Sequence, residues 1–217
     1  MSAEQIGLDR PHVFQPADDA AAGPPLLLLH GTGGDEHDLL PLRDYLSPGA
    51  AVLSVRGTVL ENGMPRFFRR LREGVFDEDD LRQQADNLAE FVGLACQTYG
   101  IDDGSLVAVG FSNGANIASA MMLRRPGVLA GAVLLAAMVP FAEPPAADLS
   151  GALAIISNGA RDPMITAQMT KLLARQLAER GAEVIELPHS GGHQIDPAVL
   201  PQIRTLIAGL PVINREP

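Results

Sequence analysis

The sequence predicts an α/β fold, with a mostly parallel central sheet and helices on both of its faces. Two patterns support this class: short apolar runs typical of buried strands, and amphipathic stretches with helical spacing that alternate with them along the chain. The chain has 217 residues and is 47% hydrophobic, which is enough to bury one substantial core. Because no repeat, long linker or shift in composition marks a boundary, we expect a single domain over residues 1–217.

The expected strands are short runs rich in leucine, valine, isoleucine and alanine. Such continuous apolar runs are typical of strands that are buried on both faces of a parallel sheet. Near the N-terminus, His12–Phe14 is a candidate edge strand. In chain order, the other expected strands are Leu26–Leu29, Ala51–Val55, Leu106–Val109, Ala132–Ala137, Leu153–Ile156 and Val184–Leu187.

The expected helices place apolar residues three and four positions apart. This spacing occurs in Leu81–Tyr99 and in Ile165–Arg180, and the second of these ends at Gly181, a typical C-terminal stop. Ala115–Leu123 has a helical pattern, and a closing helix is expected over Pro197–Leu210. No long apolar stretch suggests a lid helix, so we expect a minimal lid.

Charge and hydropathy exclude several classes of function. The net charge of −10 and the sequence pI of about 4.8 leave no basic surface for nucleic acid or for an anionic membrane. No apolar run reaches the ~18 residues that span a bilayer, and the N-terminus lacks the basic start and apolar core of a signal peptide. We therefore expect no nucleic-acid or membrane partner and a cytoplasmic location. Cys96, the only cysteine, is interpreted as a packed core thiol.

The segment Gly110–Gly114 reads Gly-Phe-Ser-Asn-Gly and is the most informative motif. Gly-x-Ser-x-Gly between a strand and a helix is the nucleophile elbow of serine hydrolases, in which a sharp turn exposes the serine hydroxyl. Ser112 has this context, because an apolar run precedes it and a helical pattern follows it. Ser112 is therefore the candidate nucleophile.

The candidate base and its orienting carboxylate follow Ser112 in the order that this type of site uses, which is Ser, then Asp or Glu, then His. Asp162 lies in a turn-rich stretch after the expected strand Leu153–Ile156, and His193 lies after Val184–Leu187. Loops beyond the carboxyl ends of strands are where open α/β sheets gather reactive groups. If neutral His193 is the base, hydrolysis should fall on the acid side of neutrality.

A glycine-rich loop, His30–Asp35, follows the first buried strand and is typical of an oxyanion hole. The expected donors are the backbone N–H of Asn113 and that of Thr32 or Gly33. The loop lacks the Gly-Lys-Ser/Thr ending of a P-loop and the spacing of a dinucleotide site, which argues against nucleotide binding. His30 could polarise a substrate, but we favour a role in fixing the loop by hydrogen bonding.

No metal or other cofactor is expected. His189 and His193 are four positions apart, a spacing that can bind metal on one helix face. The residues between them, Ser-Gly-Gly, form a poor helix, so we favour the triad role for His193 and expect no metal site.

With these residues in place, the chain resembles an α/β-hydrolase of the small carboxylesterase and acyl-protein thioesterase (phospholipase/carboxylesterase) family. The resemblance covers nearly the whole chain, and three segments are similar to a bacterial subgroup associated with hydroquinone and catechol handling: 30–36, 61–70 and 110–118. It implies the α/β-hydrolase fold, ester or thioester hydrolysis without a cofactor, the triad Ser112, Asp162 and His193, and an oxyanion hole at Thr32 and Asn113. The thioesterase branch usually has Gln where this chain has Asn113, which bears on the substrate and not on the chemistry.

Positions 66–70 read Arg-Phe-Phe-Arg-Arg in a chain with only 4% aromatic residues. One interpretation is a substrate-binding wall, in which Phe67 and Phe68 line the pocket and Arg66 and Arg69 lie at its mouth to bind aryl or carboxylate-bearing esters. The other is a loop whose phenylalanines pack on the core and whose arginines pair with nearby acidic residues. Both interpretations stay open on the sequence.

The sequence thus predicts a carboxylic ester hydrolase that acts on small esters, with aryl esters as one candidate class, through an acyl-enzyme. One alternative is a thioesterase or lysophospholipase that acts on longer acyl chains. Another is a non-catalytic ligand-binding protein on the same fold. The expected partner is a small-molecule ester, and the oligomeric state is left open, with a homodimer as one alternative.

Overall fold

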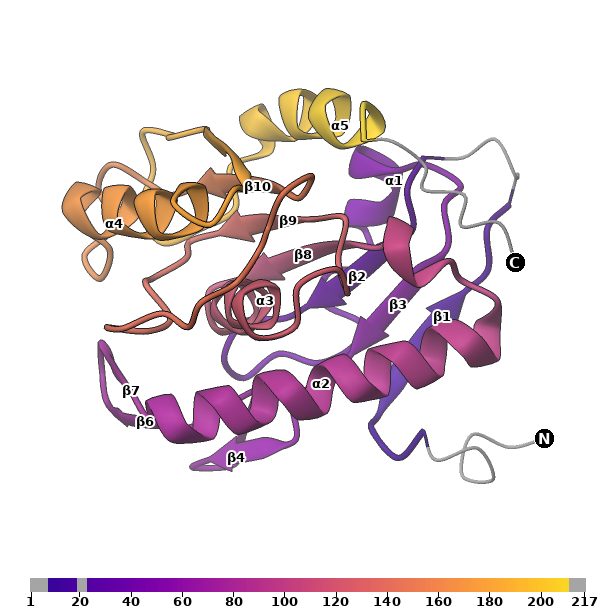
Figure 1. Ribbon diagram of the computed structural model, residues 1–217, viewed down its shortest axis with the longest axis horizontal. Coiled ribbons are helices and arrows are strands. Elements are labelled where there is room, and N and C mark those ends of the chain that lie inside the picture. Colours follow the sequence, from indigo (N-terminus) through magenta and orange to yellow (C-terminus); the bar gives the residue numbers. More distant parts are fainter. Residues whose placement is uncertain (1–7, 19–22, 211–217) are drawn as a thin grey trace.

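A seven-stranded sheet organises the molecule, and the computed structural model describes residues 8–18 and 23–210 (Figure 1). All neighbouring strands are parallel except β1, which pairs antiparallel with β3 at one edge. In spatial order the strands are β1 (His12–Gln15), β3 (Val52–Val55), β2 (Leu26–Leu29), β8 (Val107–Phe111), β9 (Gly131–Leu135), β10 (Leu153–Ser157) and β11 (Glu183–Glu186).

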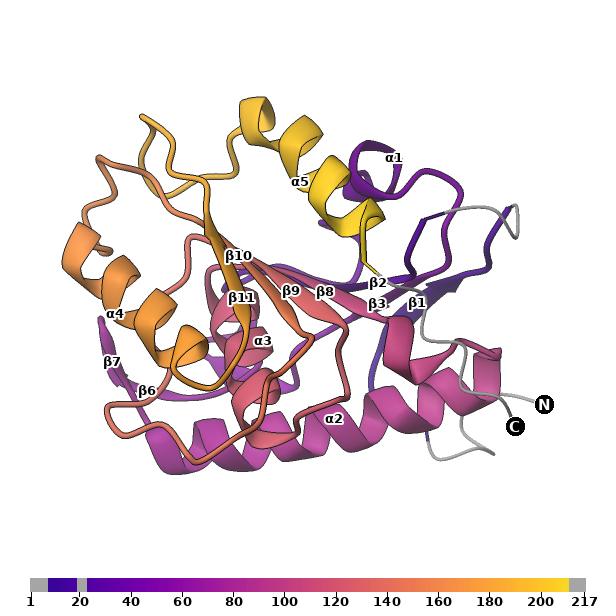
Figure 2. The ribbon, with the colours of Figure 1, turned by 45° about the horizontal axis from the view of Figure 1, so that its top comes forward.

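Helices cover both faces of this sheet. Figure 2 shows α1 and α5 on one face and α2, α3 and α4 on the other. Their bounds are α1 Leu42–Leu46, α2 Glu78–Tyr99, α3 Asn113–Arg124, α4 Ala167–Ala178 and α5 Leu200–Ala208, with short 3-10 turns at Asp103–Ser105 and Pro197–Val199. Over the described ranges, no helix is both long and apolar enough to cross a membrane.

The hydrophobic core has two layers, one on each side of the sheet. Successive side chains of a strand point to opposite faces, so Leu27 and Leu29 pack under α2 and α3 while Leu26 and Leu28 pack under α1 and α5. All four leucines are fully buried. The run of four leucines is thus explained by a central strand with both faces covered, and the predicted fold class is confirmed.

The predicted strands and the four predicted helices are all present, with ends displaced by a few residues. The predicted strand Ala132–Ala137 is observed as Gly131–Leu135. The strand stops early because Ala136 has a positive φ of 53° and turns away, with its N–H bonded to the Ser157 carbonyl at 2.9 Å. This turn lies beside the nucleophile loop.

Two small hairpins after β3 were not predicted. The first pairs β4 (Val59–Glu61) with β5 (Met64–Arg66), and the second pairs β6 (Arg70–Arg72) with β7 (Val75–Phe76). Asn62-Gly63 turns the first hairpin with φ angles of 52° and 81°, the conformation that favours Asn-Gly in two-residue hairpins. Residues 66–70 run from the end of the first hairpin to the start of the second, so the two hairpins determine which of these residues face the pocket.

Candidate functional site

Ser112 occupies a sharp turn between β8 and α3. Its φ of 51° and ψ of −110° are rare for a residue with a side chain. Its N–H is fixed to the Leu135 carbonyl at 2.8 Å. The flanking glycines allow this turn: a Cβ on Gly114 would collide with the Leu29 carbonyl, and a Cβ on Gly110 would collide with the Gly114 backbone.

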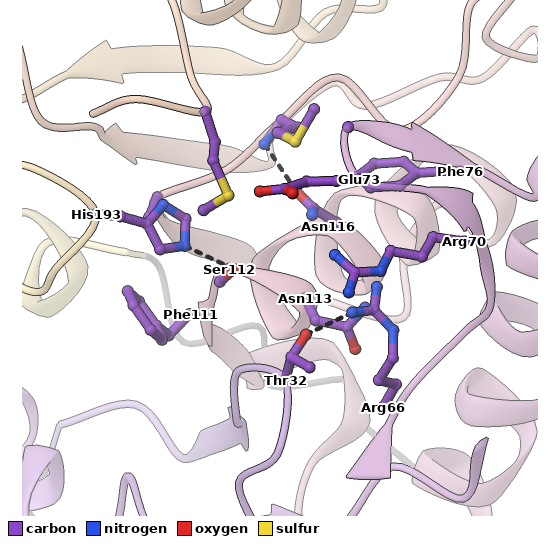
Figure 3. A pocket seen from close by; sticks show the side chains of 14 residues that line it. Thr32, Arg66, Arg70, Glu73, Phe76, Phe111, Ser112, Asn113, Asn116 and His193 are labelled. Atoms are coloured by element: carbon purple, nitrogen blue, oxygen red, sulfur yellow. Dashed lines mark hydrogen bonds between the residues drawn. The ribbon is translucent and has the colours of Figure 1, made fainter. Parts of the chain in front are cut away.

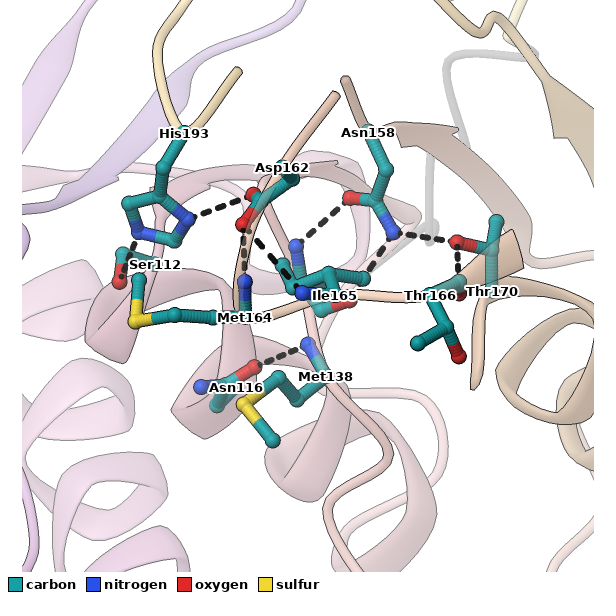
Figure 4. A network of polar contacts seen from close by, with 11 residues as sticks. Ser112, Asn116, Met138, Asn158, Asp162, Met164, Ile165, Thr166, Thr170 and His193 are labelled. Atoms are coloured by element: carbon teal, nitrogen blue, oxygen red, sulfur yellow. Dashed lines mark hydrogen bonds and ion pairs between the residues drawn. The ribbon is translucent and has the colours of Figure 1, made fainter. Parts of the chain in front are cut away.

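His193 joins Ser112 to Asp162 in one hydrogen-bonded chain (Figure 4). Its Nε2 lies 2.9 Å from Ser112 Oγ, and its Nδ1 lies 2.7 Å from Asp162 Oδ2. The Asp162 side chain is fully buried, and its Oδ1 accepts the N–H groups of Met164 at 2.8 Å and Ile165 at 3.2 Å. A carboxylate in this position accepts a hydrogen bond from a protonated Nδ1. Nε2 then carries no proton and can accept the hydrogen bond of the Ser112 hydroxyl.

The loops that carry Asp162 and His193 are bound to each other. Ala160 N–H donates to the His189 carbonyl at 2.7 Å, and Arg161 N–H donates to the Gly191 carbonyl at 2.9 Å. Gly159 has no room for a Cβ, because the Gly191–Gly192 backbone lies against it. The loop after β10 and the loop after β11 thus bring the two side chains together, because these two strands are parallel neighbours.

The two expected oxyanion donors lie beside Ser112. Asn113 is the first residue of α3, and Thr32 lies in the loop after β2; both line the same cavity as Ser112. Gly33, the alternative to Thr32, donates its N–H to the Pro65 carbonyl at 2.9 Å. Of the two candidates in the loop, Gly33 is therefore engaged elsewhere, and the Thr32 amide is the better donor.

One short segment, Pro65–Phe67, contacts both of these donor residues. Arg66 Nη1 donates to Thr32 Oγ1 at 2.6 Å, and the Phe67 N–H donates to Asn113 Oδ1 at 2.7 Å. Together with the Pro65–Gly33 bond, the segment holds the oxyanion loop and the start of α3. No local sequence pattern predicts these contacts, because they join residues more than thirty positions apart. The side chain of Asn113 therefore has a structural partner of its own.

His30 links the oxyanion loop to the segment after β3. It is 1% exposed, its Nδ1 lies 2.6 Å from the Gly31 carbonyl, and its Nε2 accepts the Gly57 N–H at 3.0 Å. Burial lowers the pKa of His30 from its ordinary value of 6.5, because desolvation disfavours the charged ring. A neutral ring with its proton on Nδ1 satisfies both contacts, which favours the structural role over polarisation of a substrate.

A cavity of about 260 Å³ opens in front of Ser112 (Figure 3). Its apolar wall includes Phe76, Phe111, Met138 and Met164. Its polar lining consists of Thr32, Arg66, Arg70, Glu73, Ser112, Asn113, Asn116 and His193.

Of the four residues proposed to bind substrate, the structure brings only Arg66 to this cavity. Phe67 and Phe68 are 1% and 0% exposed and are not among the lining residues. Phe67 packs against His30 and Phe68 against Phe76, with ring centroids 4.8 and 5.0 Å apart.

Arg69 lies between β5 and β6, where its side chain is 63% exposed and pairs with Asp77 at 3.1 Å. For Phe67, Phe68 and Arg69 the packing interpretation therefore fits the structure. Arg70 lines the cavity although the sequence did not single it out.

The two histidines with metal-type spacing have separate environments. His193 faces Ser112, whereas His189 Nδ1 accepts the Gly191 N–H at 3.2 Å. Within the described parts of the chain, no three His, Cys, Asp or Glu side chains are grouped as metal ligands.

Comparisons of the sequence and of the structure with known proteins point to the same family. The family model described as Phospholipase/Carboxylesterase matches residues 9–210. The chain is similar to the hydrolase MhqD of Bacillus subtilis (strain 168), with 47% identity over 170 residues, 78% of this chain and 85% of that protein.

Two solved carboxylesterases have the same fold. The Bacillus cereus carboxylesterase has 43% identity and a TM-score of 0.89 over 94% of this chain and 95% of that one. The carboxylesterase of Mesorhizobium loti has 32% identity and a TM-score of 0.81 over 86% and 88%. The resemblance inferred from the motifs is thereby confirmed, and the chain belongs to the phospholipase/carboxylesterase family.

Proposed function

We propose that this protein hydrolyses small carboxylic esters through a covalent acyl-enzyme on Ser112. The observation that carries the proposal is the hydrogen-bonded chain from Ser112 Oγ through His193 to the buried Asp162. The nucleophile is within hydrogen-bond distance of the base, and the base is within hydrogen-bond distance of the orienting carboxylate, as nucleophilic catalysis requires. The carboxylesterase names of two related structures support the choice of ester as the reacting group.

In the first half of the reaction, Ser112 Oγ attacks the ester carbonyl while His193 Nε2 takes the hydroxyl proton. The carbonyl oxygen becomes an oxyanion that the backbone N–H groups of Thr32 and Asn113 stabilise. The tetrahedral species collapses, His193 gives its proton to the leaving alkoxide, and the alcohol departs. In the second half, His193 takes a proton from water, the resulting hydroxide attacks the acyl carbonyl, and Ser112 leaves with its proton restored.

The size and lining of the cavity support small substrates. At about 260 Å³ it is below the ~300–1,000 Å³ of pockets that enclose drug-sized ligands. Phe76 and Phe111 provide aromatic surface, so aryl esters join short alkyl esters as candidates. Longer acyl chains, as in the thioesterase or lysophospholipase alternative, would have to extend outside this cavity.

A panel of 4-nitrophenyl esters from acetate to dodecanoate, together with phenyl acetate and a butyryl thioester, tests the proposal. We expect kcat/KM to be highest for acetate to butyrate and to fall beyond that length. The Ser112→Ala variant, prepared in parallel, is the control for contaminating esterase. Higher kcat/KM for dodecanoate would favour the long-chain alternative, and no hydrolysis of any member would favour a binding protein.

A further inference from the structure

Arg70 lines the cavity, and only the Nε of its guanidinium group is hydrogen-bonded to another described residue. The residue lies at the start of β6 and its side chain is 29% exposed. Its Nε donates to both carboxylate oxygens of Glu61, at 2.9 and 3.1 Å. Neither Nη group has a hydrogen-bond partner among the residues that the structure describes, and Figure 3 shows them directed into the cavity. Glu61 thus orients the guanidinium group and leaves its two Nη groups, the Arg70 fork, available to a ligand.

Arg66 and Arg70 form one wall of the cavity and share a single carboxylate partner, Glu61. Arg66 lies next to Arg70, is 3% exposed, and also approaches Glu61, at 3.4 Å. One carboxylate therefore faces two guanidinium groups. Desolvation lowers the pKa of Arg66, and the charge of Arg70 acts in the same direction. Glu73 also lines the cavity and carries a negative charge. It is exposed, and it forms no ion pair with another described residue.

The position of this wall indicates which half of an ester it would meet. Figure 3 shows His193 on one side of Ser112 and Arg70 with Phe76 on the other. His193 must reach the leaving oxygen to protonate it, so the alcohol half leaves on the His193 side. The acyl half then extends past Thr32 and Asn113 toward Arg70.

We propose that the Arg70 fork binds a carboxylate at the far end of the acyl group, so that the preferred substrates are half-esters of short dicarboxylic acids. This inference rests on the proposed function and specifies its substrate class. Two parallel N–H···O bonds from a planar guanidinium match a carboxylate, and the apolar wall of the cavity strengthens them. Arg66 remains bound to Thr32 and Phe68 and contributes charge without direct contact.

The test compares matched pairs of substrates. The monoethyl esters of succinic, glutaric and adipic acid are assayed beside ethyl esters in which an isopropyl group replaces the free carboxylate. The readout is the ratio of kcat/KM for each half-ester to that of its neutral partner. We expect Arg70→Met to lower this ratio about 10- to 100-fold for the best chain length, and Arg70→Lys to recover only part of it. Glu73→Gln should raise the ratio, because it removes a negative charge from the lining.

Arg72→Met is the matched control, because Arg72 is on the same strand, is exposed and does not line the cavity. It should leave both members of each pair unchanged. A second control carries the carboxylate on the alcohol half, as in acetoxyacetate, and Arg70→Met should not lower its rate selectively. Equal ratios for the parent and Arg70→Met, with both esters hydrolysed, would overturn this inference and leave the esterase proposal intact. Failure to hydrolyse any of the esters would instead contradict the proposed function.

Discussion

Ser112 adopts a backbone conformation that costs about 1–3 kcal/mol for a residue with a Cβ. The surrounding structure sustains it through the Ser112–Leu135 hydrogen bond and the close packing at Gly110 and Gly114. The hydroxyl is thereby directed at His193 before any substrate binds. This arrangement lowers the reorganisation needed for attack, which is the physical basis of the proposed role.

Replacing either end of this hydrogen bond should abolish most of the activity. We expect Ser112→Ala and His193→Ala each to lower kcat/KM for a short ester by ~10⁴-fold, because one removes the nucleophile and the other its base. Circular dichroism serves as the control for folding. Residual activity within tenfold of the parent, after exclusion of contaminating esterase, would contradict these roles.

His30 should make the stability of the protein depend on pH. Its pKa is lowered by burial in the folded state, so the unfolded chain takes up a proton first as the pH falls below about 6.5. The contribution of neutral His30 is therefore complete above that pH and decreases in acid. We expect the difference in free energy of unfolding between the parent and His30→Gln, measured with urea, to be smaller at pH 5.5 than at pH 7.5. A constant difference would show that His30 is not the group responsible.

At the scale of elements, strand β5 and the residue after it connect the separate parts of the site. They bond to Gly33 and Thr32 in the loop after β2 and to Asn113 at the start of α3. The two proposed oxyanion donors thus lie on different elements but share one support. Their spacing is set by this hairpin as well as by the central sheet.

The Arg66–Thr32 hydrogen bond offers a test of this support. Thr32→Val keeps the shape and the backbone N–H but removes the acceptor of Arg66 Nη1. We expect kcat to fall about tenfold with a smaller change in KM, less than the ~10²- to 10³-fold cost of losing an oxyanion donor outright. Thr32→Ser retains the hydroxyl and should stay near the parent value. Equal losses in the two variants would show that the hydrogen bond does not position the loop.

At the scale of the whole molecule, the sequence predicted the features that local patterns determine. The leucine run Leu26–Leu29 indicated a central strand, and the Gly-x-Ser-x-Gly motif with the order of Ser112, Asp162 and His193 indicated residues that the structure places in one hydrogen-bonded chain. The parallel sheet explains this placement, because the carboxyl ends of its strands meet at one edge.

The orientation of residues 66–70 could not be predicted in the same way. Two hairpins and the segment between them decide it. Phe67 packs against His30, and Arg70 is bonded to Glu61, contacts that join residues distant in the sequence. The Asn62-Gly63 pair is the sequence signal for the first hairpin, but it does not determine where the residues after that hairpin point. Nothing comparable in the sequence distinguishes Arg70 from Arg69.

Phe67 and Phe76 should therefore differ in what their loss affects. Phe67 is buried, so Phe67→Ala should lower the free energy of unfolding by about 3–5 kcal/mol and leave the ratio of aryl to alkyl ester hydrolysis unchanged. Phe76 lines the cavity, and Phe76→Ala should lower that ratio. Chemical denaturation and kinetics on phenyl and ethyl acetate measure the two effects. A change in the ratio for Phe67→Ala without loss of stability would instead support the interpretation in which Phe67 lines the pocket and contacts substrate.

The central claim, that Ser112 forms a covalent intermediate, is tested most directly by mass spectrometry after reaction with a fluorophosphonate. The parent protein should gain one adduct, and peptide mapping should place it on Ser112. The Ser112→Ala variant should gain none, and His193→Ala should react much more slowly because the hydroxyl has lost its base. An adduct on another residue, or an unmodified parent protein that still hydrolyses esters, would contradict the account.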